Sequence, residues 1–303
     1  MNNVVLLVAC FVVGMLLRQS GRLPENAHVS LNGFIIHVSL PALTLISVRG
    51  LALDWSLLAP AAMAWIMFGL GCVFFWWIGR AMNLRRPTIG ALMMTGSLAN
   101  TSFVGVPMIE AYFGPHGVGL GILIDQAGTY LVLSTLGMFV AAIYSQGGMP
   151  TALTVLKKIF TFAPFIAFVA ALALIPVAYP SWVQTLLDRL GATLVPLALV
   201  SVGYQIQIRQ ARGRLRELSV GLFFKLVAAP AAIAILYAGL FGARGEMVQI
   251  TIFEAAMPPQ IGAAIVAMDH DLDPQLVTLM VGIGIPLSFL TLFAWRQVLP
   301  VIA

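Results

Sequence analysis

Two stretches of the sequence, GSLANTSFVGVP at residues 96–107 and FEAAMPPQIG at residues 253–262, decide the fold. Each places helix-breaking and polar residues in the middle of a long apolar run. Proline removes a backbone hydrogen-bond donor and clashes with the preceding turn, so a helix that contains it bends or breaks. In lipid the freed backbone groups must find partners inside the protein or beside a wet cavity. The two stretches therefore predict two interrupted transmembrane helices.

The composition of the whole chain is that of a membrane protein. Its 303 residues are 60% hydrophobic and 9% charged, with a mean hydropathy of +0.99. A soluble domain would carry roughly a quarter charged residues, so lipid must be the main solvent of this chain. The net charge of +5 does not indicate a nucleic-acid partner, because the basic residues lie in loops between apolar runs, as they do in cytoplasmic loops of membrane proteins.

Apolar runs divide the chain into ten predicted spans, since a spanning helix needs ~20 apolar residues. The first is short for a bilayer, and no soluble catalytic domain fits between the runs. The fold class is therefore an all-α polytopic membrane protein. The predicted spans are Asn3–Leu17, His28–Val48, Ser56–Gly79, Thr88–Phe113, Gly117–Tyr144, Ile159–Tyr179, Trp182–Gln205, Leu218–Leu240, Met247–Met268 and Pro274–Pro300.

The lysines and arginines predict the orientation in the membrane. Most lie in alternate loops, and an excess of basic residues marks the cytoplasmic side. With an even number of spans, both termini then face outward from the cell inner (plasma) membrane. The loops predicted to be cytoplasmic hold Arg18, Arg22, Arg80, Arg85, Arg86, Lys157, Lys158, Arg209, Arg212, Arg214 and Arg216, whereas Arg49, Arg189, Arg244 and Arg296 lie on the other side.

The chain also contains a weak internal repeat. PALTLISV from Pro41 resembles PLALVSV from Pro196, and the same offset places Asn100 opposite the proline-broken part of the second stretch. Residues 1–145 and 146–303 are therefore predicted to be equivalent halves of five spans each. Because five is odd, the second half would enter from the other side of the membrane, as in an inverted repeat.

The two interruptions form the candidate binding site. At 1.5 Å per residue, Asn100 and Pro258 lie roughly 18 Å and roughly 16 Å from opposite surfaces, which is near the midplane of a ~30 Å core. Half-helix N-termini that meet there would offer free N–H groups and positive dipole ends to a carboxylate. The alternative is that the prolines only kink packed helices. The predicted substrate-binding residues are Asn100, Thr101, Ser102, Pro107, Pro258, Pro259 and Gln260.

These motifs resemble the auxin efflux carrier family, which includes bacterial malonate-transporter-like carriers and plant auxin exporters. The resemblance rests on the two stretches, the second extended to AAMPPQIGAAIVAMD, together with LPALTLISV at residues 40–48 and KLVAAP at residues 225–230. It implies a ten-helix fold similar to the sodium/proton antiporters and the bile acid symporters, in which spans 4 and 9 cross. Spans 3–5 and 8–10 would form a transport domain, and spans 1, 2, 6 and 7 a scaffold that dimerises.

Buried charges are candidates for ion coupling, because a carboxylate at membrane depth is costly and is functional by default. Asp125 and Glu254 are the acids that fall well within predicted spans. Thr129 and Lys225, which also lie within predicted spans, are the other two candidates for ion coupling. The sequence leaves three roles open: a sodium site, a proton carrier, or a structural pair with Lys225. Lys225 itself is expected to extend its ammonium toward the cytoplasmic surface, with a substrate or carboxylate partner as the alternative. The stretch around Glu254 resembles part of the sodium site of the bile acid symporters, and the predicted sodium ligands are Asn100, Thr101 and Glu254.

The resulting hypothesis is a secondary transporter of a small organic anion, such as malonate or an auxin-like acid, that works by an elevator-like motion. No cofactor other than a sodium ion is expected, and the expected partners are the anion, the lipid bilayer and a second copy of the chain. The alternative is an anion channel or a facilitator without ion coupling, because broken helices also line pores. The sequence contains no nucleophile-elbow or metalloprotease motif, so an enzyme is not expected.

Overall fold

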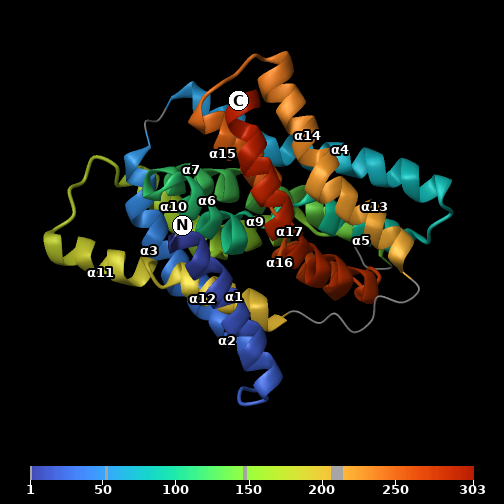
Figure 1. Ribbon diagram of the computed structural model, residues 1–303, viewed down its shortest axis with the longest axis horizontal. Helices are drawn as coiled ribbons and strands as arrows, with labels where there is room; N and C mark the ends of the chain where they lie inside the picture. Colours follow the sequence, from blue (N-terminus) through green and yellow to red (C-terminus); the bar gives the residue numbers. More distant parts are fainter. Residues whose placement is uncertain (1, 52–53, 146–148, 206–213) are drawn as a thin grey trace.

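The computed structural model describes residues 2–51, 54–145, 149–205 and 214–303, so that residues 1, 52–53, 146–148 and 206–213, with Arg209 and Arg212, lie outside the described residues. Within these ranges the chain forms helices and no named strand (Figure 1). The one β-type contact among them is an isolated antiparallel bridge between Ala99 and Pro259.

In the described part of the chain, six helical stretches are long and apolar enough to cross a membrane, and they correspond to the predicted spans 2, 3, 5, 7, 8 and 10. The first helix, α1 (Asn2–Ser20), is apolar but shorter. The arrangement of ten spans in two inverted halves stays a prediction. The six are Ala27–Gly50 with α2 (Ala27–Phe34), η1 (Ile35–Ser39), α3 (Leu40–Ser47) and η2 (Val48–Gly50); Trp55–Ala81 with η3 (Trp55–Leu57) and α4 (Leu58–Ala81); Pro115–Tyr144 with η5 (Pro115–Gly117), α7 (Val118–Leu123), η6 (Ile124–Tyr130), η7 (Leu133–Gly137) and α8 (Met138–Tyr144); Ser181–Gln205 with α11 (Ser181–Gly191) and α12 (Leu194–Gln205); Leu215–Leu240 with α13 (Leu215–Phe223), η8 (Phe224–Ala228), α14 (Ala229–Ala234) and η9 (Ile235–Leu240); and α17 (Pro274–Ile302).

The two segments predicted to be interrupted are both broken. The first consists of α5 (Arg86–Ser97), the π-helical turn η4 (Thr101–Gly105) and α6 (Val106–Phe113). The second consists of α15 (Glu246–Ala255) and α16 (Ile261–Asp269). In the second segment the break contains Pro258 and Pro259, which lack backbone donors. In the first, the helix ends at Ser97, and Pro107 lies beyond the break in the first turn of α6, where proline is tolerated.

The sixth predicted span, Ile159–Tyr179, is wrong as a continuous helix. The chain forms α9 (Ala152–Thr161) and α10 (Ala163–Ala173), which meet at 68°. Phe162 between them has an extended backbone, and Pro164 starts the next helix. The helix α10 also ends before Tyr179, the last residue of the predicted span. This has a local cause, because Pro176 has no N–H group to continue the helical hydrogen bonds. The pair counts as one further span only if α9 and α10 cross the membrane together.

Close backbone contact joins α1 to α12. A side chain on Gly203 would collide with the carbonyl oxygen of Phe11, and one on Gly14 with that of Val200. Small residues permit such close approach of helices in membrane proteins. Elsewhere α3 packs on α10 and α11, whereas α5 packs against α4, α8, α16 and α17.

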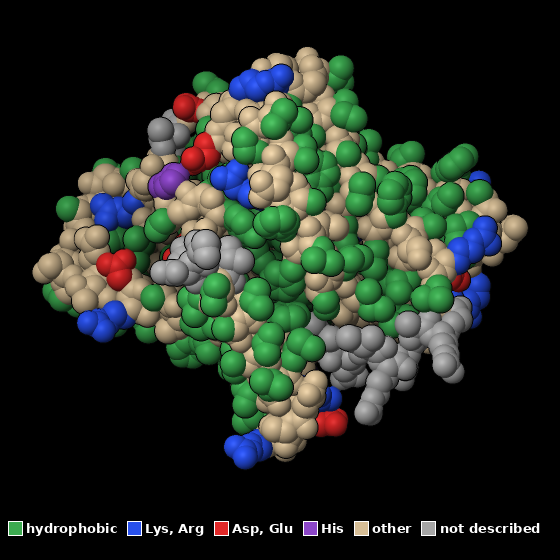
Figure 2. All heavy atoms as spheres, viewed as in Figure 1, with side chains coloured by type: hydrophobic (Ala, Val, Ile, Leu, Met, Phe, Trp, Pro, Cys, Tyr) green, Lys and Arg blue, Asp and Glu red, His purple; other side chains and the backbone are tan. Residues whose placement is uncertain are grey.

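Apolar side chains cover much of the surface, and many of the lysines and arginines in view lie toward its margins (Figure 2). Trp77, Phe223, Leu290 and Phe293 are among the large exposed hydrophobic residues. A water-soluble monomer rarely exposes contiguous apolar surface of this kind, so the surface is that of a protein in lipid.

Candidate functional site

The unwound parts of the two broken segments lie side by side. The amide of Asn100 donates to the carbonyl oxygen of Pro258 at 2.8 Å, and the amide of Gln260 donates to that of Leu98 at 3.2 Å. These two bonds flank the bridge between Ala99 and Pro259. Both helix breaks therefore occur at one crossing, where η4 and α16 begin.

Two amide side chains at the crossing have unused hydrogen-bonding atoms. Asn100 accepts a 3.1 Å bond from the amide of Phe103 and so caps η4. Its Nδ2 is buried without a partner, and so is Oε1 of Gln260. An unpaired buried polar group is costly, so these atoms mark a place for a polar ligand.

Asp125 lies beside the crossing and is saturated with hydrogen bonds. Its Oδ1 accepts from the hydroxyls of Thr101 and Ser102, each at 2.5 Å, and its Oδ2 accepts from Gln126 at 2.6 Å. The structure thus places Asp125 next to Thr101 and Ser102.

Glu254 has the opposite environment. Its side chain is fully buried, and both carboxyl oxygens lack a hydrogen-bond partner. Gly105 and Gly121 leave the space that the carboxyl group occupies, because a Cβ on Gly105 would collide with both oxygens and one on Gly121 would lie 3.2 Å from Oε1. An unpaired buried carboxylate is costly, so such a group is either protonated or binds a cation.

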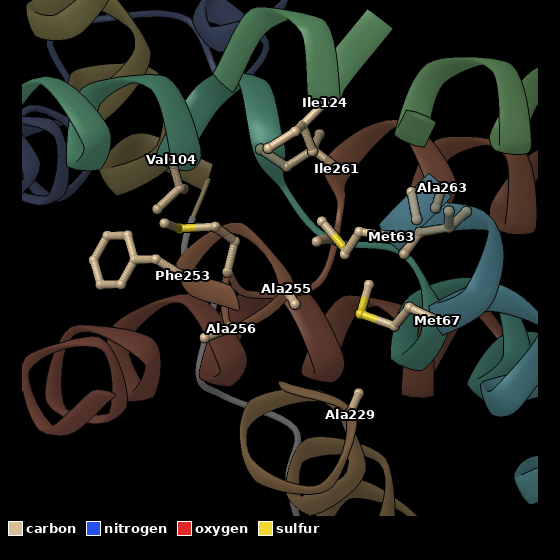
Figure 3. Packing of buried hydrophobic residues seen from close by; sticks show 14 of the residues in the cluster. Met63, Met67, Val104, Ile124, Ala229, Phe253, Ala255, Ala256, Ile261 and Ala263 are labelled. Atoms are coloured by element: carbon tan, nitrogen blue, oxygen red, sulfur yellow. The ribbon is translucent and has the colours of Figure 1, made fainter. Parts of the chain in front are cut away.

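Lys225 does not extend to the membrane surface, so that expectation is wrong. Its side chain is 0% exposed, and Nζ donates to the carbonyl oxygen of Ala255 at 2.8 Å. Ala255 is the last residue of α15, whose final carbonyl groups have no intrahelical partner. The ammonium therefore caps the negative end of α15. The sulfur of Met67 lies 3.9 Å from Nζ, and Figure 3 shows Met67 near Ala255.

A cavity of about 340 Å³ lies against the crossing. Its lining includes Asn100, Ser102, Asp125 and Gln260, which were predicted as site residues. Sequence reasoning missed the remaining wall, which includes Ile36, Phe103, Tyr130, Lys158 and Phe162. Apolar residues at a wall carry no sequence signal that separates them from the core, and Lys158 stood next to Lys157 as an ordinary basic loop residue.

Other predicted site residues lie outside this wall. Pro107 is buried in α6, and Thr129 is buried with a hydroxyl group that has no partner. Pro258 and Pro259 shape the crossing through their backbone, and Pro259 packs against Gly284. In the described part of the chain, no group of three or more His, Cys, Asp or Glu side chains is arranged to hold a metal ion.

A second cavity of about 580 Å³ shares part of its wall with the first. The two share Ile36, Phe103, Ile261, Gly262 and Ile265, and the second extends between α2 and the pair α16 and α17. Its lining is mainly apolar and includes His28 and Thr278.

Comparison with known proteins places this geometry in context. The sequence profile of a family described as "Membrane transport protein" matches residues 1–147 and 150–296. An uncharacterized transporter of Methanothermobacter thermautotrophicus is 27% identical over 303 residues, covering 98% of each chain. An uncharacterized transporter of Methanocaldococcus jannaschii is 22% identical over 309 residues, covering 99% of this chain and 98% of that protein.

Proposed function

Because the chain belongs to the membrane transport protein family that includes the auxin efflux carriers, we propose that it is a secondary active transporter of a small organic anion. The substrate is a carboxylate, such as malonate or an auxin-like acid. The observation that carries the proposal is the pairing of two helix breaks, at Asn100 and Pro258, beside a cavity lined by unpaired amide groups.

The substrate occupies the cavity at the crossing. Asn100 Nδ2 donates a hydrogen bond to it, and the Gln260 side chain and the Ser102 hydroxyl group contact its other polar atoms. Thr101 holds Asp125 in place rather than contacting the substrate. Pro258 and Pro259 keep the backbone of the second segment interrupted, whereas Pro107 lies in the first turn of α6 beyond the break of the first segment.

Coupling to an ion gradient is assigned to Glu254, with Asp125, Thr129 and Lys225 as its surroundings. The unpartnered carboxyl oxygens of Glu254 support a site that takes a proton or a sodium ion. For sodium, Asn100, Thr101 and Glu254 would supply oxygen ligands, and the ion would neutralise the buried carboxylate. Lys225 stabilises the end of α15 next to this site.

Alternating access follows from an elevator-like movement of spans 3–5 and 8–10 against spans 1, 2, 6 and 7. The second cavity, which lies between α2 and the pair α16 and α17, supports a division at this place. We further propose ten spans in a 5+5 inverted repeat, both termini outside the inner (plasma) membrane, and a homodimer.

The experiment is flux into proteoliposomes that contain the purified protein. A carrier gives saturable uptake with counterflow, whereas an anion channel, the alternative, gives unitary currents and no counterflow. Asn100→Ala should abolish uptake, whereas Asn26→Ala, which changes an exposed asparagine without a capping bond, should leave it unchanged. Equal uptake by both variants would refute the binding role of the crossing.

A further inference from the structure

Two buried prolines each leave a backbone carbonyl group without its helical donor. In an α-helix, the carbonyl oxygen of a residue accepts from the amide four residues later, and proline has no N–H group to donate. Pro230 stands four residues after Leu226, and Pro259 stands four residues after Ala255. Leu226 and Ala255 are both buried, so each carbonyl group needs a donor from elsewhere.

A side chain from a neighbouring helix supplies a donor at both places. The indole nitrogen of Trp295 on α17 donates to the carbonyl oxygen of Leu226 at 3.0 Å. The Nζ atom of Lys225 donates to the carbonyl oxygen of Ala255 at 2.8 Å. Lys225 and Leu226 are consecutive residues of η8. The residue that serves the second carbonyl group is therefore held next to the first.

The π-helical turn η8 sets the direction of the Lys225 side chain. The turn is wider than an α-helical one, because the amide of Ala229 donates to the carbonyl oxygen of Phe224, five residues before it. One extra residue in a turn changes the direction of the following side chains by roughly 100°. The bond from Trp295 to Leu226 fixes this turn at the residue next to Lys225.

Lys225 depends on that direction because its ammonium group is fully buried. The side chain is 0% exposed. Among the described residues, Nζ donates to one oxygen, that of Ala255, and its other contact is the sulfur of Met67 at 3.9 Å. A rotation of η8 would leave both the ammonium group and the end of α15 unpaired, which is costly in the interior. Ala255 is also where α15 ends and the break that leads to Gln260 begins.

We propose that Trp295 is a positioning residue for the crossing: its indole N–H group holds η8 so that Lys225 caps α15. The cap in turn keeps the backbone from Ala255 to Gln260 in the geometry that binds substrate. Trp295 is not among the described residues that line the cavity, so it acts through Lys225. The effect on substrate rests on the proposed function, whereas the two hydrogen bonds do not.

Trp65 offers a matched control for the loss of an indole donor. Its nitrogen donates to the carbonyl oxygen of Ala127 in η6 at 3.2 Å. The residue four positions after Ala127 is Leu131, which has an N–H group. A backbone donor is therefore available to Ala127 when the indole is removed, and Trp65→Phe should have a smaller effect than Trp295→Phe.

The first test measures the bond to Leu226 in the full-length protein in detergent, by the thermal unfolding midpoint. Trp295→Phe keeps an aromatic ring but removes the donor, and it should lower the midpoint by a few degrees, more than Trp65→Phe does. Pro230→Ala supplies an amide four residues after Leu226. In that background Trp295→Phe should lower the midpoint by roughly half as much or less, because the carbonyl group has its own donor. An equal loss in both backgrounds would mean that Trp295 acts through packing alone, and would overturn the proposal.

The second test separates positioning from stability by uptake kinetics in proteoliposomes, with radiolabelled malonate and indole-3-acetate as probes. A displaced binding backbone raises the apparent KM, whereas a loss of folded protein lowers the maximal rate and leaves KM unchanged. Trp295→Phe and Lys225→Met should each raise the apparent KM by roughly tenfold. The double variant should raise it no further, because the two residues act as one unit. An unchanged KM in Trp295→Phe would overturn the positioning role.

The inference and the proposed function fail in different ways. If wild type takes up neither probe, the proposed function fails for these carboxylates, and the comparison in the Pro230→Ala background still decides whether the indole holds η8. If Lys225→Met raises the apparent KM and Trp295→Phe does not, Lys225 keeps its role at the end of α15, and Trp295 does not position it.

Discussion

The backbone amide of Asn100 donates its hydrogen to the carbonyl oxygen of Pro258, across the crossing of two broken segments. Both groups lie in unwound backbone, where a continuous helix would have satisfied them internally. With the bond from Gln260 to Leu98, this contact forms a short antiparallel bridge. It joins two unwound stretches whose backbone groups both need hydrogen-bond partners. The bridge thus holds both interruptions open together, and a change that closes one should disturb the other.

Pro259→Ala tests this dependence. Alanine supplies an N–H group and lets α15 continue toward α16, and it removes the ring that packs on Gly284. We expect at least a tenfold loss of substrate flux in proteoliposomes with normal yield of the purified protein. Pro300→Ala is the control, since Pro300 is exposed near the end of α17. Full flux in Pro259→Ala would show that the interruption does not need the second proline.

The positions of the helix breaks were predictable because they depend on local chemistry. Two consecutive prolines, or the run around Asn100, interrupt a helix wherever they stand. The bend at Phe162 was missed because a 68° change of direction between α9 and α10 leaves the apolar composition unchanged, and only Pro164 marks it. Proline at the start of a helix is common and does not by itself indicate a bend.

The polar partners of the site were only partly predictable. Asp125 and Glu254 stood out because acids are rare at membrane depth. Their opposite surroundings, one saturated and one unpartnered, depend on which helices pack around them. Lys225 was misplaced for the same reason: the length of its side chain permits an extended route to the surface, but the end of α15 lies within reach and offers an unpaired carbonyl group.

Gly105→Ala should displace the Glu254 carboxyl group. The added Cβ would occupy the space of both carboxyl oxygens, and Glu254 sits on a helix that cannot easily retreat. We expect the flux to lose its response to an imposed proton or sodium gradient, while exchange of substrate without a gradient is reduced less. Gly69→Ala is a matched control, because no atom lies within 4 Å of its added Cβ. A gradient response like that of wild type would argue against the coupling role of Glu254.

Gly203→Val should destabilise the contact between α1 and α12. Even a Cβ at this position meets the carbonyl oxygen of Phe11, and backbone cannot yield as a flexible side chain can. Overpacking of a close contact costs about 1–3 kcal/mol, so the thermal unfolding midpoint in detergent should fall by several degrees relative to wild type. Gly69→Val provides the comparison at an open position of α4. Equal thermal unfolding midpoints for Gly203→Val and Gly69→Val would mean that α1 can separate from α12 without loss of stability.

Lys225 and Glu254 should behave as an energetically coupled pair although they form no ion pair within 4 Å in the described part of the chain. If both groups are charged, they should attract each other through the low-dielectric interior at the end of α15. Removing one charge of a buried pair leaves the other uncompensated, whereas removing both does not. Lys225→Met should therefore lower the unfolding midpoint, and the double variant Lys225→Met with Glu254→Gln should recover part of the loss.

The coupling free energy from this cycle should fall at about 0.5–3 kcal/mol, the range for residues that interact directly. Recovery should be incomplete, because methionine leaves the carbonyl group of Ala255 without its donor whatever stands at position 254. Asp125→Asn in place of Glu254→Gln is the matched control, since three hydrogen bonds already satisfy Asp125 and its loss should add to that of Lys225→Met rather than offset it. If the double variant with Glu254→Gln were no more stable than Lys225→Met alone, Glu254 would be neutral in the folded protein, and its carboxyl group would carry a proton instead of balancing the buried ammonium.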